Sequence, residues 1–364
     1  MILMNDFKAE PTTLKQAIVD SIKTVVDSGW YVLGDKLTNF EASWAEVCGT
    51  KFAIGVGNGL DAIEIILRSL GIGPGDEVIT TPMTAFATVL AVQRCGATPV
   101  LADIEPGSAN LSIASTIAAV TAKTKAVMPV HLYGQIQDMK PWQSLCEERG
   151  LHLVEDCAQA HLAGMEGKIA GSFGIAGAYS FYPTKNLGAL GDAGMIVTSD
   201  PVINETARRL RNYGQGERYH HPDAGMNSRL DEIQAAILQT RLGWLKEFTI
   251  RRRSIAEAYH SRISNPSLKM LDKPVVQGSH SYHLFVINCP QRKALEQHLN
   301  HAGIQTLIHY PVLACDQPAF SGSSRDSLSS SRQHAETCLS IPCHPQMSDT
   351  EVTAVINAIN NFKG

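Results

Sequence analysis

The chain has 364 residues, of which 44% are hydrophobic and 18% are charged, and its formal net charge is −4. This composition is typical of a soluble globular protein of about two domains. It disfavours a general nucleic-acid-binding protein, because the charge is mildly acidic and no basic stripe alternates with aromatic residues.

Targeting signals and cysteine spacing further restrict the class of protein to which the chain can belong. No apolar stretch is long enough to cross a bilayer, and no signal-peptide pattern opens the chain. The eight cysteines are scattered and form no C-x-x-C pair, which disfavours both a metal site and a disulfide framework. We therefore expect a cytoplasmic protein with reduced thiols, without metal ligands and without a membrane partner.

Helical patterns open the chain, and they predict helices over residues 12–30 and 38–49. Between residues 50 and 200, short apolar runs alternate with further helical patterns. The runs predicted as strands are residues 76–81, 98–104, 124–134, 151–159 and 176–184. The patterns predicted as helices are residues 62–71, 87–96, 112–123 and 139–150. This alternation predicts an α/β fold with a mostly parallel sheet, whose ligands bind beyond the carboxyl ends of the strands.

A smaller α+β unit is predicted to follow. Residues 230–263 form one long helical pattern, whose three arginines at 251–253 are expected to lie on a solvated face. Beyond it we expect strands over 282–289 and 304–310, helices over 292–303 and 348–362, and a mobile polar loop over 321–331. We therefore predict a large domain with the N-terminal helices over residues 1–245 and a small C-terminal domain over residues 246–364.

Three features meet at the carboxyl edge of the predicted sheet. The turn Gly57-Asn58-Gly59 joins a strand to a helix, which makes either an anion site or a plain tight turn. Asp156 lies within the run 151–159, where the apolar strand ends, and Glu155 beside it should point to the opposite side. Such an aspartate does chemistry or caps a turn. Lys185 is the only cation between residues 180 and 198, where it is a buried reactive amine or a lysine that extends to the surface.

The combination is more specific than any one feature. An anion cradle, a carboxylate and an amine are the groups that hold pyridoxal 5′-phosphate (PLP). The amine bonds to the aldehyde of PLP, and the carboxylate partners its pyridinium nitrogen.

The motifs also fit one pattern over nearly the whole chain. The stretches that carry it are SGWYVLGDKLTNFEASWAEVCGTKFAIGVGNGLDAI, GPGDEVITTPMTAFATVLAVQRCGATPVLADIE, VEDCAQAH, SFYPTKNLGALGDAG, GMNSRLDEIQAAIL and IHYP. Over these stretches the chain resembles the DegT/StrS-like sugar aminotransferases of PLP fold type I. The resemblance implies an aspartate aminotransferase-like fold with a large PLP-binding domain and a smaller α+β domain. It also implies a homodimer that moves an amino group from L-glutamate to a nucleotide-linked keto-sugar for amino-sugar biosynthesis.

The resemblance further implies roles for individual residues. Lys185 matches the Schiff-base lysine and the catalytic base, and Asp156 matches the partner of the pyridinium nitrogen. Gln159 matches a residue near the phenolic oxygen of PLP. The positions that match phosphate-binding residues are Gly59, Leu60 and Ser180.

One residue of the pattern implies that the active site is shared between subunits. Asn227 matches an asparagine that reaches the phosphate of the neighbouring subunit's cofactor. Because Asn227 precedes a long helical pattern, N-terminal capping is the alternative role for this loop.

The chain departs from the family pattern at one contact. Many members place an aromatic residue directly after the threonine that matches Thr84, where it stacks on the cofactor ring. Here Ala85 follows, and Phe86 comes one residue later. Phe86 therefore either shifts onto the cofactor or belongs to the core of the helix.

The substrate is less well defined by the sequence. The stretch RNYGQGERYHH, followed by NSRLDEIQAA, resembles enzymes that act at C3 of dTDP-linked 6-deoxy-keto-hexoses more than those that act at C4. A C4 or UDP-sugar enzyme stays an alternative. The residues that could line the sugar-nucleotide site, or equally lie in loops and interfaces, are Tyr219, His220, His221, Arg229, His309 and Tyr310.

Three readings of another class remain. A related branch that deoxygenates sugars carries histidine in place of the lysine, so Lys185 argues against it. A non-catalytic PLP-binding regulator is disfavoured by the intact lysine, aspartate and phosphate cradle. A lyase of the same fold type is disfavoured only through the NSRLDEIQAA and IHYP segments.

Overall fold

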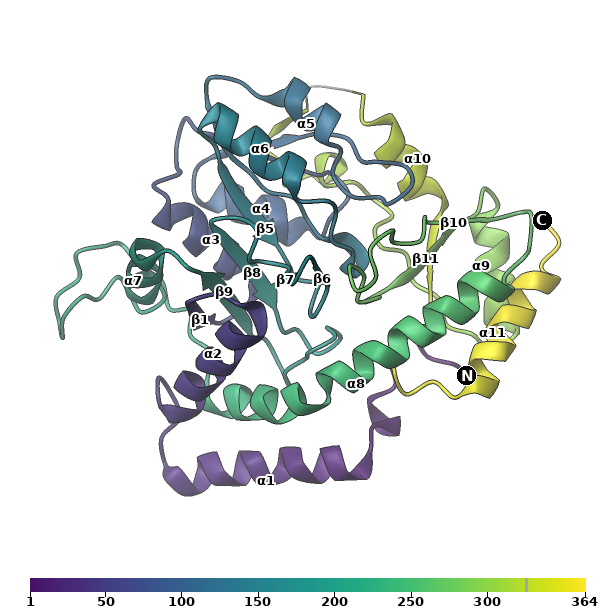
Figure 1. The fold of residues 1–364 in the computed structure, drawn as a ribbon, viewed down its shortest axis with the longest axis horizontal. Coiled ribbons are helices and arrows are strands. Elements are labelled where there is room, and N and C mark those ends of the chain that lie inside the picture. The colour runs from purple at the N-terminus through teal and green to yellow at the C-terminus, as the bar shows by residue number, and fades with distance from the viewer. Residues whose placement is uncertain (325–326) are drawn as a thin grey trace.

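An eight-stranded sheet forms the centre of the protein in the computed structural model, which describes residues 1–324 and 327–364 (Figure 1). The strands, in their order across the sheet, are β1 (Phe52–Val56), β9 (Gly194–Thr198), β8 (Ala176–Ser180), β5 (His152–Asp156), β4 (Thr124–Val127), β2 (Glu77–Thr80), β3 (Thr98–Leu101) and β12 (Ser323–Ser324). All neighbours pair in parallel except β9, which is antiparallel to both β1 and β8. The predicted mostly parallel sheet is therefore confirmed.

Helices cover both faces of this sheet, which explains why its strands are almost entirely buried. One face packs against α3 (Gly59–Ser69), α4 (Phe86–Arg94) and α7 (Pro201–Leu210). The other face packs against α2 (Asp35–Cys48), α5 (Ile113–Ala119), α6 (Lys140–Arg149) and the start of α8 (Glu232–Arg262). Side chains of each strand alternate between the two cores, so Leu153 belongs to one apolar cluster and Val154 to the other.

The long helix α8 connects the large sheet to a smaller C-terminal unit (Figure 1). That unit has an antiparallel sheet of β10 (Lys269–Met270), β11 (Phe285–Asn288) and β13 (Cys338–Ile341). Its core also includes α9 (Arg292–His301), α11 (Asp349–Asn361) and the end of α8. This is the predicted α+β unit, and the domain boundary between residues 245 and 246, which falls inside α8, stays a prediction.

The remaining elements are short or lie outside both cores. They are α1 (Thr12–Ser28), which packs along α8, then α10 (Ser329–Thr337), the hairpin of β6 (Gly164–Met165) and β7 (Lys168–Ile169), and the 3₁₀ turns η1 (Phe7–Ala9), η2 (Leu132–Gly134) and η3 (Ala314–Asp316). No helix in residues 1–324 and 327–364 combines the length and apolar character that crossing a membrane requires.

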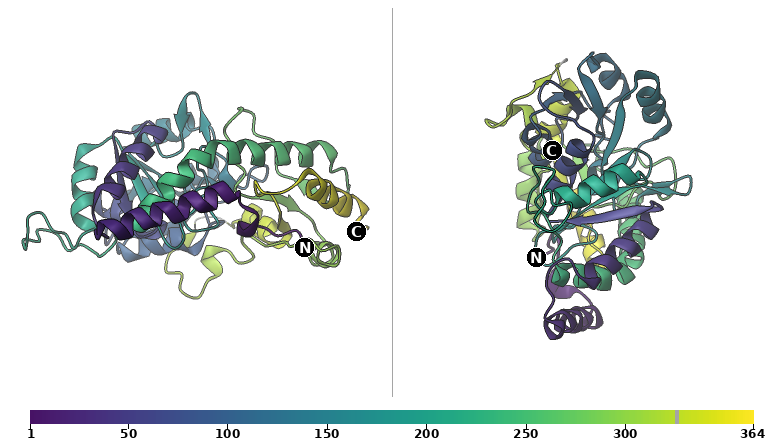
Figure 2. Two further views of the ribbon diagram at one scale, coloured as in Figure 1. Left: turned by 90° about the horizontal axis from the view of Figure 1, so that it is seen from below. Right: turned by 90° about the vertical axis from the view of Figure 1, so that its left-hand side faces the viewer.

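The start of the chain is fixed to its C-terminal third. The Ile2 amide donates to the Gly303 carbonyl at 2.7 Å, and the Gln305 amide donates to the Ile2 carbonyl at 2.9 Å. Met4 is buried beside this contact. Both termini consequently lie at the end of the molecule that carries α9 and α11 (Figures 1 and 2).

Three sequence predictions are corrected by the structure. Residues 304–310 form isolated bridges, of Ile304 with Ile2 and of Leu307 with Ser340, rather than a strand. The polar tract 321–331 contributes β12 and the start of α10, so it is not one loop, and Arg325 and Asp326 lie outside the described residues.

The third correction concerns the arginine run. Arg252 is 5% exposed, although its neighbours in the run are only partly buried. Its guanidinium donates to the carbonyls of Tyr282, His283 and Cys343 at 3.3, 3.3 and 2.7 Å. These hydrogen bonds compensate for the lost hydration of a buried charge, which a sequence pattern alone does not reveal.

Candidate active site

A cavity of about 410 Å³ lies beyond the carboxyl ends of β1, β5 and β8. Six of the predicted site residues line it: Gly59, Leu60, Asp156, Gln159, Ser180 and Lys185. Since β5 and β8 are parallel neighbours, the residues that end them are brought to the same edge.

The glycine turn is shaped by very close packing against β8 and β9. A Cβ on Gly59 would lie 2.8 Å from the Ser180 Cβ, and one on Gly194 would lie 2.3 Å from the Asn58 carbonyl carbon. Asn58 caps α3, because its Oδ1 accepts from the Asp61 amide at 2.8 Å. The preceding amides of Gly59 and Leu60 have no partner within the helix and border the cavity, which suits an anion.

Asp156 is almost fully buried at the end of β5. Its Oδ2 accepts from the Thr88 hydroxyl at 2.9 Å and its Oδ1 accepts from the Ala158 amide at 3.1 Å. Burial raises the pKa of Asp156, while the Ala158 amide, Thr88 and Lys185 oppose that rise. A cation placed in the cavity would favour the charged carboxylate in the same way.

Lys185 follows β8 and is partly buried where it borders the cavity. Burial is the main effect on its amine and lowers the pKa of Lys185 from 10.5 to about 8, although Asp156 acts in the opposite direction. Near pH 8 about half of the Lys185 amines are therefore neutral and nucleophilic, against roughly 0.3% for an ordinary lysine.

The lowered pKa of Lys185 can be measured by acetylating the cofactor-free protein with acetic anhydride at a series of pH values. We expect the labelling of Lys185, followed by mass spectrometry, to reach half of its plateau near pH 8, because only the neutral amine reacts. Because the folded pKa lies below 10.5, the unfolded chain binds more protons between pH 8 and 10.5, so this group adds stability as pH rises through that interval. A labelling midpoint at 10.5, as in a lysine model compound, would contradict the assignment.

These three groups fit PLP. The amides at the start of α3 suit its phosphate, Asp156 suits its protonated ring nitrogen, and Lys185 suits its aldehyde. All three border one cavity, and the cradle at Gly59 leaves no room for a side chain.

Gln159 is held in place by two tyrosines. Its Oε1 accepts from the Tyr133 amide at 2.6 Å, and its Nε2 donates to the Tyr310 hydroxyl at 3.2 Å. Tyr310 is thereby brought to the site. His309 is near enough to Lys185 to be affected by its charge, and burial first, then Lys185, lower the pKa of His309 to about 4.

The remaining predicted residues lie away from the cavity. The long loop after α7 projects from the body of the protein (Figure 1), and its Tyr219, His220 and His221 are exposed. Asn227 is also exposed, and Arg229 stacks over the Tyr213 ring with 5.5 Å between the guanidinium carbon and the ring centre. None of these residues lines the cavity of this subunit.

Of the two roles predicted for Phe86, its position favours the helix core over a contact with the cofactor. It begins α4 and packs beside the cluster of Val89, Leu101, Ala314 and Leu328, so it belongs to the helix core. The smaller Ala85 borders the cavity in its place. The reason is that Ala85 is the extended residue before α4 whereas Phe86 is the first residue of the helix, so their side chains point to different sides.

Sequence reasoning missed the groups that hold the site residues. Thr88 binds Asp156, and Thr84 is linked to Thr88 by a hydroxyl–hydroxyl hydrogen bond of 2.7 Å. The spacing of two threonines by four residues at a helix start was the available signal. Ser228 and Asp61 meet beneath the glycine turn, and no pattern in the sequence joins them.

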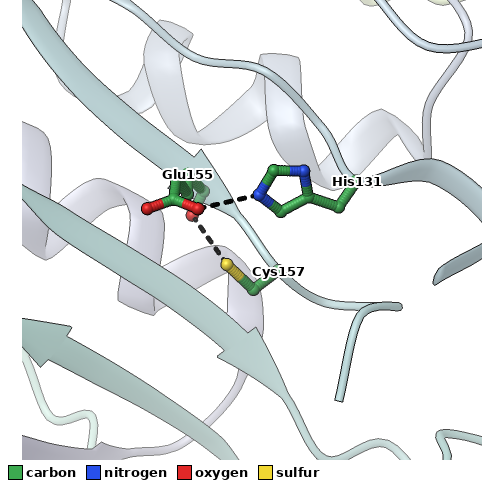
Figure 3. A group of neighbouring side chains, drawn as sticks. All are labelled: His131, Glu155 and Cys157. Atoms are coloured by element: carbon green, nitrogen blue, oxygen red, sulfur yellow. Dashed lines mark hydrogen bonds and ion pairs between the residues drawn. The ribbon is translucent and has the colours of Figure 1, made fainter. Parts of the chain in front are cut away.

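A second polar cluster lies on the other face of β5 (Figure 3). Glu155 accepts from the His131 ring at 2.8 Å and from the amides of Gly171, Phe173 and Gly174 at 2.8, 2.8 and 2.7 Å. The Cys157 thiol donates to the Glu155 carbonyl, and burial raises the pKa of Cys157. With both carboxylate oxygens engaged and the thiol protonated, this cluster fixes the segment between β7 and β8 against β5 rather than a metal ion.

The comparison with protein families matches residues 12–360 to the DegT/DnrJ/EryC1/StrS aminotransferase family. The chain belongs to this family. Membership confirms the predicted aminotransferase class and the predicted PLP cofactor. The roles of the individual site residues stay predictions.

Several relatives in the family are similar over nearly their full length. The dTDP-3-amino-3,6-dideoxy-α-D-galactopyranose transaminase of Aneurinibacillus thermoaerophilus is 42% identical, covering 100% of this chain and 99% of the relative. The dTDP-3-amino-3,4,6-trideoxy-α-D-glucose transaminase of Streptomyces venezuelae is 41% identical, covering 98% and 95%. A UDP-N-acetyl-3-dehydro-α-D-glucosamine 3-aminotransferase of Acidithiobacillus ferrooxidans is 37% identical, covering 98% and 97%.

Solved structures of the family have the same fold. The crystal structure of S. venezuelae DesV superposes with a TM-score of 0.94 at 41% identity, covering 99% of this chain and 97% of DesV. Bacillus subtilis NtdA, solved with bound pyridoxamine phosphate, superposes with a TM-score of 0.88 at 26% identity, covering 96% and 82%. The predicted PLP fold type I is thereby confirmed.

Proposed function

We propose that the protein transfers an amino group from L-glutamate to C3 of a dTDP-linked keto-6-deoxyhexose, as a step in amino-sugar biosynthesis. The observation that carries the proposal is the similarity to two dTDP-3-amino-sugar transaminases, at 42% and 41% identity over at least 98% of the chain. The site geometry supports the same reaction class, because one cavity combines an anion cradle, a buried carboxylate and an amine of lowered pKa.

Each part of the site has a task in this reaction. PLP, when bound, supplies an electron sink that makes the α-proton of the amino donor removable. Lys185 Nζ would anchor the cofactor. As a free amine it would take the proton from the donor α-carbon and pass it to the cofactor carbon that carried the aldehyde, since a pKa near 8 allows both steps. The Asp156 carboxylate orients the ring nitrogen and stabilises its charge, and the amides of Gly59 and Leu60 bind the phosphate.

The position of amination can be tested directly. We expect the purified protein to convert a dTDP-3-keto-6-deoxyhexose with glutamate to a product whose nitrogen is on C3, as identified by NMR. The matched assay uses the dTDP-4-keto isomer and UDP-linked 3-keto-sugars at the same concentrations. A product with nitrogen on C4 would reject the C3 assignment while leaving the aminotransferase class intact.

A UDP-linked substrate is the second candidate, because the A. ferrooxidans relative is named for a UDP-sugar. A higher kcat/KM for the UDP-linked 3-keto-sugar than for its dTDP counterpart would select this candidate.

We further propose that the protein works as a homodimer with shared active sites. Asn227 supports this view, because its side chain is exposed and lies in a bridge with Asn212 outside the cavity of its own subunit. The capping alternative has little support, since the N-cap of α8 is Asp231, four residues later. An amide that faces outward is available to the phosphate of a partner subunit's cofactor.

Mixed dimers test the shared site. Lys185→Ala subunits combined with Asn227→Asp subunits form one site with both defects and one site with neither. We expect each parent dimer to be poorly active and the mixed dimer to regain up to half of the wild-type activity per dimer. Full activity of the Asn227→Asp parent, or verified mixed dimers that recover nothing, would disprove the shared site.

A further inference from the structure

Ser228 lies directly beneath the turn that would hold the PLP phosphate. Its hydroxyl accepts from the Gly57 amide at 3.0 Å and donates to the Asp61 Oδ2 at 2.7 Å. Ser228 is 1% exposed, and its own amide donates to the Arg211 carbonyl at 2.9 Å. One hydroxyl therefore joins the first residue of the turn to the first turn of α3.

The Asp61 carboxylate makes this link important. An acidic side chain in the first turn of a helix is attracted to the same amides that bind an anionic ligand. Here the Asp61 oxygens are engaged by the Ser228 hydroxyl, by the side-chain Nδ2 of Asn58 at 3.0 Å and by Arg94 at 3.4 Å. These contacts keep the carboxylate occupied, so the amides of Gly59 and Leu60 stay available to the cavity.

We infer that Ser228 is a positioning residue for the phosphate turn of its own subunit, while the adjacent Asn227 serves the partner's site. The inference rests on the proposed shared dimer only for the role of Asn227. Successive residues of an extended segment face opposite sides, and here Ser228 is buried while Asn227 is exposed. Two neighbouring residues thus contribute to two different active sites.

The first test measures cofactor affinity. Loss of the Ser228 hydroxyl leaves the Gly57 amide unpaired and removes the shortest of the three contacts to the Asp61 carboxylate. Ser228→Ala should therefore raise the Kd for PLP about tenfold. The Kd for pyridoxal, which lacks the phosphate, should change less than about twofold. Ser69→Ala is the matched control, because its hydroxyl binds the Ile65 carbonyl at the far end of α3, and it should change neither value.

An unchanged Kd for PLP, or an equal loss of affinity for pyridoxal, overturns the inference. Unfolding of the cofactor-free variant, followed by circular dichroism, checks that the protein is folded. If Ser228→Ala does not fold, Ser228→Cys provides the same test, since a thiol of similar size is a weak hydrogen-bond partner.

The second test assigns the defect to a subunit. Mixed dimers of Ser228→Ala and Lys185→Ala subunits are assayed at a PLP concentration between the wild-type and Ser228→Ala Kd values. The only site that keeps Lys185 then has the damaged turn, so the activity per dimer should be about half of that of the Ser228→Ala parent. Recovery to half of the wild-type activity would show that Ser228 acts across the interface and would overturn the inference.

The Asn227→Asp and Lys185→Ala pair, assayed in parallel, keeps the two proposals separate. Failure of that pair to recover counts against the shared site. It leaves the affinity test of Ser228 unaffected.

Discussion

Replacing Lys185 with alanine is expected to lower the rate of transamination by at least about 10³-fold, because the variant loses both the covalent anchor and the proton-transfer base. No other lysine lines the cavity among the residues that the structure describes. The visible absorbance band that PLP gains on bonding to a lysine should also disappear. PLP itself should still bind through the phosphate turn, which Lys185 does not form.

Turnover with glutamate and absorbance spectra of the purified variant check this prediction. Lys51→Ala is the matched control, because Lys51 is exposed before β1 and away from the cavity, and it should keep wild-type activity. Near-normal transamination by Lys185→Ala would remove the basis of the proposed mechanism.

Replacing Asp156 with asparagine is expected to lower kcat by about 10²-fold or more, since the amide keeps the size of the side chain but carries no charge to stabilise a protonated ring nitrogen. The substituted side chain could still pair with the Thr88 hydroxyl and the Ala158 amide, so the fold should be retained. The loss should therefore fall on kcat rather than on the KM for glutamate.

Steady-state kinetics and thermal unfolding of the Asp156→Asn enzyme separate these effects. Asp138→Asn makes the same chemical change at an exposed position and should leave both parameters unchanged. An Asp156→Asn enzyme with wild-type kcat would show that the carboxylate has no part in catalysis.

The features that the sequence predicts well are those fixed by local chemistry. Asp156 and Lys185 can be singled out in the sequence because each is a polar residue that follows a buried apolar run. Parallel pairing of β5 and β8 then brings the two residues to the same edge of the sheet. The Gly57–Gly59 turn is visible because close backbone packing demands glycine at Gly59.

What the sequence does not predict depends on distant partners. Arg252 has the pattern of a solvated helix face, and its burial depends on carbonyls that lie 30, 31 and 91 residues later in the chain. Phe86 packs in the core while its neighbour Ala85 borders the cavity, because the chain changes from extended to helical between them. Ser228 and Asp61 are 167 residues apart, so their hydrogen bond has no local signal.

The pairing of Ile2 with residues 303 and 305 affects the order in which the chain can fold during synthesis. At roughly 5–20 residues per second, a ribosome needs about 15–60 s after adding Ile2 to reach its partners, Gly303 and Gln305. During that time the N-terminal segment lacks its hydrogen bonds to Gly303 and Gln305. The edge strand β12, near residue 324, adds the last neighbour of β3 still later. The protein consequently reaches its final arrangement only after residue 324 has been synthesised, and premature termination before residue 300 would leave the N-terminal segment without its docking site.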